Sequence, residues 1–121
     1  HIFRVTKLLH VVDGDTVDVV VDKKHSISQE LRVRLLEVDT PEKKDREAWT
    51  RATEFTTFWM ARAMEVGNLA FEGERMDSFG RALGYFWDSY TAEGLHVRLV
   101  QEKLGTEVGL YEHLRALGVV D

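Results

Sequence analysis

A chain of 121 residues is long enough for one hydrophobic core and too short for two, so we expect a single domain over residues 1–121. The apolar fraction of 44% excludes a disordered chain, and no apolar run approaches the ~20 residues that cross a bilayer. The absence of cysteine excludes disulfides and thiolate zinc sites, and leaves secreted and cytoplasmic locations both open. A net charge of -5 disfavours a polyanion partner, although a local cation site can still attract phosphate.

The first third of the chain predicts three antiparallel strands. Residues 2–12 are rich in branched side chains and indicate a strand, which the Asp-Gly pair within residues 13–16 ends as a hairpin. Valines at alternate positions of residues 17–22 predict the second strand, and the polar residues 23–30 predict a loop. A third strand is expected over residues 31–36, so the three strands form a meander.

A helical period replaces the strand pattern from residue 45. Apolar residues recur at three- and four-residue steps, which predicts an amphipathic helix over residues 45–64 with Gly67 as its terminator. The apolar stripe, with Phe58 beside it, is expected to be core and consists of Ala48, Ala52, Phe55, Trp59 and Ala63.

The second half predicts more strands and then short helices. Strands are expected over residues 69–71 and 81–87, with loops over residues 73–80 and 88–94. Helical spacing follows over residues 97–104, where Gly105 suits a C-terminal cap.

A last helix is expected around residues 111–117, which gives five strands with one long helix between the third and the fourth. This order is typical of an α+β, mainly β fold: the OB-fold, a five-stranded Greek-key barrel with two to three packed helices.

Acidic residues gather at two predicted turns. Asp13 and Asp15 flank a glycine, while Asp39 and Glu42 end the third strand beside Pro41. Each cluster alone also fits a solvated turn. Together they describe a hard-cation site for Ca²⁺ or Mg²⁺, because both metals prefer oxygen ligands.

Two arginines accompany these acids. Arg34 lies within a strand and Arg81 opens another, and guanidinium groups aimed at one point can clamp phosphate. A structural salt bridge from Arg34 to Asp39 or Glu37 is the alternative. Strict alternation puts Arg34 and Asp39 on opposite strand faces, so their convergence requires a bend or bulge near Glu37.

A metal, two arginines and a glutamate are the parts for phosphodiester hydrolysis. The histidines show no metal-ligand spacing and are expected at the surface or as polar core residues: His1, His10, His25, His96 and His113.

Three motifs resemble those of the staphylococcal (thermonuclease-like) nuclease family. They are DGDT at residues 13–16, RLLEVDTPE at residues 34–42 and FGRALGYFW at residues 79–87. The resemblance extends from about residue 5 to residue 105 in the family's order, and three motifs at compatible spacings make it specific.

The resemblance implies an OB-fold nuclease that cleaves DNA and RNA with Ca²⁺. It implies that Asp15, Asp39 and the Thr40 carbonyl bind Ca²⁺, and that the catalytic residues are Arg34, Glu42 and Arg81. The motif leaves open whether Glu42 is a general base or positions water. The expected partners are DNA and RNA, and single strands are expected to be preferred. The protein is expected to be a monomer that does not act at a membrane.

Two further residues are expected to contact substrate. Phe79 stands where the family usually has a tyrosine, so one hydroxyl contact to phosphate is lost, and Tyr111 falls near a second family tyrosine. The competing functions are a non-catalytic nuclease-like module that binds nucleic acid or protein, and a plain OB-fold single-strand binder. The second would need a basic track, against which the net charge of -5 argues.

Overall fold

The computed structural model of the chain describes residues 1–121, apart from the side chains of Ser26 and Glu74. Its strands are β1 (Ile2–Asp13), β2 (Thr16–Lys23), β3 (Ile27–Leu35), β4 (Val38–Asp39), β5 (Leu69–Met76), β6 (Ala82–Asp88), β7 (Glu93–Gly94) and β8 (Thr106–Glu107). Its helices are α1 (Arg46–Glu65), α2 (Leu95–Gln101) and α3 (Leu110–Ala116), and a 3-10 turn covers Lys24–Ser26.

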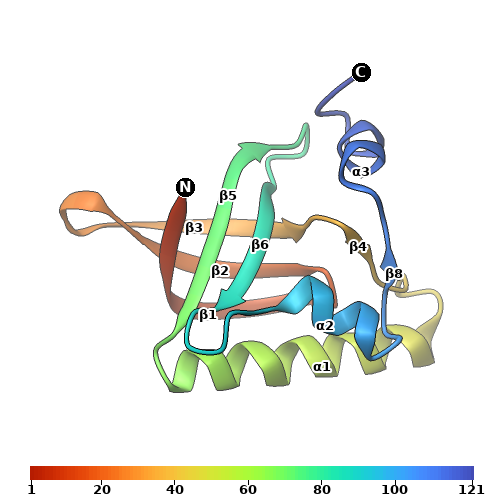
Figure 1. Cartoon of the computed structure of the whole chain (residues 1–121), viewed down its shortest axis with the longest axis horizontal. Coiled ribbons are helices and arrows are strands. Elements are labelled where there is room, and N and C mark those ends of the chain that lie inside the picture. The colour runs from red at the N-terminus through yellow and green to blue at the C-terminus, as the bar shows by residue number, and fades with distance from the viewer.

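Strands β1, β2, β3, β5 and β6 close into a barrel. β1 pairs antiparallel with β2 and β5, β2 pairs with β3, and β5 pairs with β6. The parallel pairing of β3 with β6, in which Arg34 lies opposite Leu83, joins the two edges. In Figure 1, α1 runs along the bottom of the barrel with α2 next to it, and α3 stands near the C-terminus. The predicted mainly β, OB-like barrel is confirmed.

The barrel core is built from alternate residues of neighbouring strands. Val17, Val19 and Val21 share one face of β2 and are fully buried, as the alternation predicted. The same core contains Val33 and Leu35 from β3. Full burial of each such side chain contributes roughly 1.5–3 kcal/mol, so many similar contacts hold the barrel.

Helix α1 rests on the turn between β1 and β2. A Cβ on Gly14 would lie 2.8 Å from the Cβ of Ala52, so only glycine allows this approach. The Thr56 hydroxyl donates to the Gly14 carbonyl at 2.6 Å. The helix therefore fixes the turn that carries Asp15.

The predicted end of α1 at Gly67 is confirmed. Gly67 has a φ of 74° and its N–H donates to the Met64 carbonyl, while the Asn68 N–H donates to the Ala63 carbonyl. Phe58 was expected in the core but is 63% exposed, because it lies beside the buried stripe of Ala52, Trp59 and Ala63. Within the described part of the chain, no helix combines the length and the apolar character needed to span a bilayer.

The loops predicted over residues 23–30 and 73–80 are wrong. β2 and β3 stay paired as far as Lys23 and Ile27, and β5 stays paired with β6 as far as Met76. The side chains of residues 27–30 are exposed, so no hydrophobic alternation marks this part of β3 in the sequence. The second turn is reduced to residues 77–81.

The C-terminal helices differ in their bounds from the prediction. α2 begins at Leu95 and ends at Gln101 rather than covering residues 97–104, and Lys103, not Gly105, takes the left-handed conformation with a φ of 59°. Leu104 still packs on the core from beyond the helix, which explains why its spacing suggested helix. The loop predicted over residues 88–94 contains the short strand β7.

Candidate active site

An open cleft of about 730 Å³ lies where the β1–β2 turn, the end of β3 and the start of β6 meet. All six residues predicted for catalysis or metal binding line it: Asp15, Arg34, Asp39, Thr40, Glu42 and Arg81. Asp13 and Asp45 add further carboxylates to its wall.

Asp15 is buried at the floor of the cleft. Its Oδ1 accepts a hydrogen bond from the Thr16 hydroxyl at 2.9 Å, and its Oδ2 accepts one from the Thr40 N–H at 2.9 Å. The second bond ties the β1–β2 turn to the segment after β4. It thereby places the carboxylates of Asp15 and Asp39 in one site.

The Arg34 guanidinium lies between these two carboxylates. Its Nη2 is 2.5 Å from Asp39 Oδ1 and 3.3 Å from Asp15 Oδ2. Its Nη1 donates to the carbonyls of Leu35 at 2.6 Å and Val38 at 2.9 Å. The structural salt bridge considered from the sequence is therefore present with Asp39, and Arg34 also holds the backbone of the bend.

The bend required near Glu37 is confirmed. Glu37 has a φ of 66°, in the left-handed region that a residue with a Cβ rarely adopts. This one residue interrupts the strand alternation, so that Arg34 and Asp39 reach the same side of the chain. The odd spacing between Arg34 and Asp39, which strict strand alternation would place on opposite faces, thus correctly predicted the bend at Glu37.

Arg81 approaches the cleft from the turn between β5 and β6. Its Nε donates to Asp77 Oδ2 at 2.6 Å, and Asp77 Oδ1 accepts the N–H groups of Phe79 and Arg81 at 2.9 Å each. Burial raises the pKa of the Asp77 carboxyl, but the hydrogen bonds from Arg81 and Phe79 outweigh it and leave that pKa lowered. Asp77 therefore stays ionised and orients the Arg81 side chain.

Glu42 lies at the mouth of the cleft. Its side chain is 77% exposed and its Oε2 is 3.4 Å from Lys44 Nζ. It follows Pro41, which ends the extended segment. An exposed carboxylate at this place can reach a water molecule that attacks a group bound in the cleft.

The oxygen atoms around Asp15 and Asp39 suit a hard cation. Both carboxylates already converge on one cationic nitrogen, Arg34 Nη2, and the Thr40 hydroxyl is buried with no hydrogen-bond partner in the described residues. Among those residues, no cluster of three or more His, Cys, Asp or Glu side chains gathers around one point. A hard cation held by these two carboxylates would need water or a bound ligand to complete its shell.

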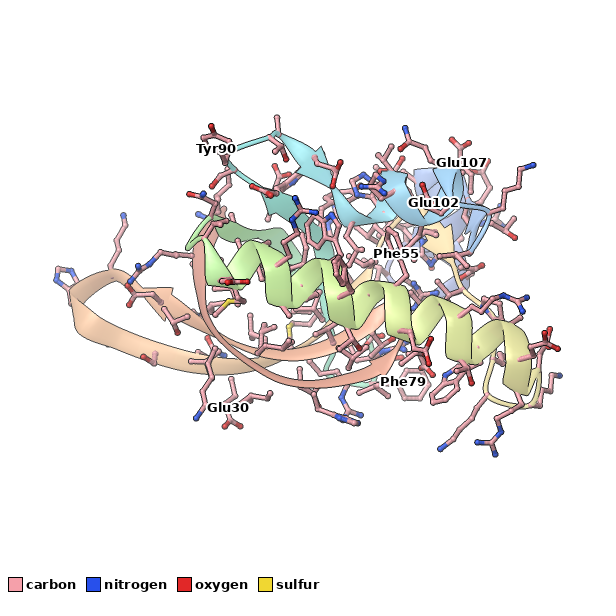
Figure 2. The ribbon with its side chains drawn as sticks, turned by 90° about the horizontal axis from the view of Figure 1, so that it is seen from below. Glu30, Phe55, Phe79, Tyr90, Glu102 and Glu107 are labelled. Atoms are coloured by element: carbon pink, nitrogen blue, oxygen red, sulfur yellow. The ribbon has the colours of Figure 1, made fainter. Side chains whose placement is uncertain are left out.

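The structure places the two expected substrate-contact residues outside this cleft. Phe79 is 82% exposed and lines an adjoining hollow with Arg32 and Arg81, whose guanidinium lies 5.7 Å from the centre of the Phe79 ring. Figure 2, seen from below, shows Phe79 on the other side of α1 from Glu102 and Glu107. Tyr111 lies on α3, where its hydroxyl donates to the Asp121 carbonyl at 3.1 Å.

His113 is a residue near the site that the sequence reasoning treated as ordinary. It is buried, its Nδ1 accepts the Glu37 N–H at 2.9 Å, and its Nε2 lies 3.7 Å from Asp39 Oδ1. Burial and the Arg34 charge lower the pKa of the imidazole, against the opposing effect of the nearby carboxylates. No local pattern could have found it, because 76 residues separate it from Glu37.

Asp77 was also missed, although a signal exists. The aspartate stands four residues before an arginine, with a glycine in the turn between them. At this spacing an aspartate side chain often accepts hydrogen bonds from the backbone of its own turn. Tyr85 was missed as well, and its hydroxyl contacts the Glu37 carboxylate. Burial is the larger cause and this carboxylate the smaller cause that raise the pKa of the Tyr85 hydroxyl.

No family model matches the chain. The chain is similar to Protein ParB of Escherichia coli, with 35% identity over 81 residues that cover 67% of this chain and 40% of that protein. It is also similar to an uncharacterised protein of Bacillus anthracis, with 28% identity over 109 residues that cover 87% of this chain and 47% of that protein. The chain spans less than half the length of these curated relatives, and neither name states an activity.

Proposed function

We propose that this chain is a Ca²⁺-dependent nuclease that hydrolyses phosphodiester bonds of DNA and RNA. The observation that carries the proposal is the shared cleft, which brings Asp15, Asp39 and Glu42 together with Arg34 and Arg81. Acids and guanidinium groups on one open surface are the parts that water attack on a phosphodiester requires.

The arginines would bind the scissile phosphate and stabilise the charge that grows on it. Arg81 is the better placed of the two, because Asp77 engages its Nε and no hydrogen bond within the described residues engages its terminal nitrogens. Arg34 would join when Asp39 exchanges its ion pair with Nη2 for the metal. Positive groups held in place before the reaction stabilise the transition state without further reorganisation.

The metal ligands would be the carboxylates of Asp15 and Asp39 and the carbonyl of Thr40. A bound Ca²⁺ would polarise the phosphate and neutralise part of its charge. The hydrogen bond from the Thr40 N–H to Asp15 Oδ2 fixes the relative position of two of these ligands.

Glu42 would act on the attacking water. From the mouth of the cleft its carboxylate would orient or deprotonate that water as the new O–P bond forms and the leaving oxygen departs. The exposed Phe79 ring beside Arg81 supports single strands as the preferred substrate, because an unpaired base can stack on an aromatic face.

A second candidate is a non-catalytic module that binds nucleic acid or protein. The contacts of Arg34 favour it, since two carboxylates and two carbonyls already surround this guanidinium and Glu42 is paired with Lys44. Such a module would bind a strand in the same cleft and leave it intact.

The test is digestion of single-stranded DNA and RNA by the purified protein with Ca²⁺, with Mg²⁺ and with chelator. We expect fragments with Ca²⁺ that chelator abolishes, and no fragments from the Arg81→Ala variant, which excludes a contaminating nuclease. Intact strands under all three conditions, with a gel shift that persists, would support the binding module instead.

A further inference from the structure

The backbone at Glu37 is held in its unusual conformation from three sides. The Glu37 N–H donates to His113 Nδ1 of α3 at 2.9 Å, and the Glu37 carbonyl accepts the Val108 N–H at 3.1 Å. The Glu37 carboxylate accepts the Tyr85 hydroxyl of β6. A residue with a Cβ avoids a φ of 66° unless its surroundings impose it, so these contacts are what keeps the bend in place.

His113 differs from the other two contacts because it faces both the bend and the cleft. Since Nδ1 accepts the Glu37 N–H, the proton of the neutral ring is on Nε2. That N–H is buried and has no hydrogen-bond partner within the described residues, and it lies 3.7 Å from Asp39 Oδ1. One imidazole thus touches the bend through one nitrogen and approaches a cleft carboxylate with the other.

We propose that His113 is a positioning residue: through it, α3 holds the left-handed bend at Glu37 and, with the bend, the position of the Asp39 carboxylate. The bend is what brings Arg34 and Asp39 to the same side of the chain, so loosening it would separate groups that the cleft needs together. The proposal deepens the proposed function and rests on it for its effect on cleavage, but the backbone effect at Glu37 does not depend on cleavage.

Three variants separate this role from plain packing of α3. His113→Phe keeps the ring volume and removes both nitrogens, while His113→Asn returns an acceptor near the place of Nδ1. Leu114→Ala is the matched control, because Leu114 is on the same helix and lines the groove against β6, and its side chain has no polar atom that could bond to Glu37. Unfolding midpoints of all three show how much stability each change removes.

The first readout is hydrogen exchange of the Glu37 amide, measured by NMR. We expect exchange in His113→Phe to be faster by about 10-fold or more, His113→Asn to restore most of the protection, and Leu114→Ala to leave it near wild type. Equal loss of protection in His113→Phe and Leu114→Ala would overturn the proposal, because it would mean that α3 acts only by packing.

The second readout is cleavage of single-stranded DNA. We expect about a 10-fold lower kcat with little change in KM for His113→Phe, since misplaced groups lose transition-state stabilisation. In a Glu37→Gly background, where glycine adopts the same φ freely, the same substitution should cost much less. An equal loss of kcat in both backgrounds would contradict the proposal.

The two proposals fail in different ways. If the wild-type protein cleaves nothing, the proposed function is wrong, and the Glu37 amide still decides whether His113 holds the bend. If the wild type cleaves and His113→Phe exchanges its Glu37 amide at the wild-type rate, only the positioning role is wrong.

Discussion

Two arginines reach the same cleft from regions that are built differently. Arg34 is the last residue but one of β3, and its side chain is 9% exposed. Its guanidinium contacts two carboxylates and donates to the carbonyls of Leu35 and Val38. Arg81 precedes β6 with a side chain that is 25% exposed, and Asp77 is its one carboxylate partner within the described residues. Arg34 holds the backbone of the bend at Glu37, whereas Arg81 lies at the end of the turn between β5 and β6.

This difference indicates how structure and chemistry are divided between the two. Removing Arg34 leaves the buried Asp15 carboxylate without its cation and frees two carbonyls, so the fold and the site should both suffer. Removing the Arg81 side chain takes the cation from the buried Asp77 carboxylate, but Asp77 keeps the hydrogen bonds from the backbone N–H groups of residues 79 and 81, so the cost to stability should be smaller. Substitutions at the two positions should therefore separate loss of stability from loss of activity.

The largest effect on activity is expected from Arg81→Ala. It should lower kcat on single-stranded DNA by about 10³-fold, because it removes a group that stabilises the transition state, and it should leave the unfolding transition cooperative. Glu42→Ala should behave in the same way. Steady-state cleavage and urea unfolding measure the two effects, and Arg4→Ala on β1 is the control for loss of an exposed arginine. A lost unfolding transition in Arg81→Ala would mean that this residue is structural.

Arg34→Ala should lose activity and stability together. We expect the free energy of unfolding to fall by about 3–5 kcal/mol, the usual cost of breaking a buried ion pair from one side. Arg34→Lys should not rescue it, since a single ammonium cannot reach two carboxylates and two carbonyls at once. Urea unfolding measures the loss, and a change below about 1 kcal/mol would show that the bend does not depend on this guanidinium.

Asp77→Asn should lower both stability and activity, stability by less than Arg34→Ala does and activity by less than Arg81→Ala does. It removes the ion pair with Arg81 and should cost about 1.5–3 kcal/mol of stability, with kcat lowered by about 10-fold as Arg81 loses its orientation. The lowered pKa of Asp77 means that its contribution is present above the ordinary value of 3.8 and is lost as pH falls through the lowered pKa. Unfolding of wild type and variant should therefore converge at strongly acidic pH, and a pH-independent difference would contradict this.

The smallest effect concerns His96, which lies away from the cleft. Burial lowers its pKa, against the carboxylates of Glu37 and Glu72, and its ring packs on Tyr85 and Trp87. The unfolded chain takes up a proton near pH 6.5 while the folded chain resists it, so stability falls as pH drops from 6.5 toward the lowered pKa. Urea unfolding of His96→Gln at several pH values should show that the free energy of unfolding depends less on pH over this range. An unchanged pH dependence would show that His96 is not its cause.

Most of the barrel strands, the acidic turn with Asp15 and the bend near Glu37 could be predicted from the sequence because their signals are local, whereas Thr40 entered the predicted site only through the family resemblance. Alternating valines marked β2, the Asp-Gly pair marked the turn with Asp15, and the strand parity placed a bend at Glu37. These features follow from two-residue periodicity and turn chemistry, which short segments carry.

The missed features depend on contacts that no local pattern encodes. His113 meets Glu37 across 76 residues, and only the folded chain brings them together. The extension of β2 and β3 into the predicted loop over residues 23–30 was missed because the side chains of residues 27–30 are exposed. Leu104 suggested a longer α2 because it packs on the core from outside the helix. Strand pairing, rather than burial, maintains the tip of the β2–β3 hairpin.

The most direct test of the cleft as one catalytic site is the Ca²⁺ concentration that gives half-maximal cleavage of single-stranded DNA. We expect Asp39→Asn to raise it by about 10-fold or more, because a neutral amide is a weaker ligand for a hard cation, while Arg81→Ala lowers the maximal rate at nearly the same Ca²⁺ requirement. An Asp39→Asn variant with the wild-type Ca²⁺ requirement would show that Asp39 serves Arg34 rather than a metal.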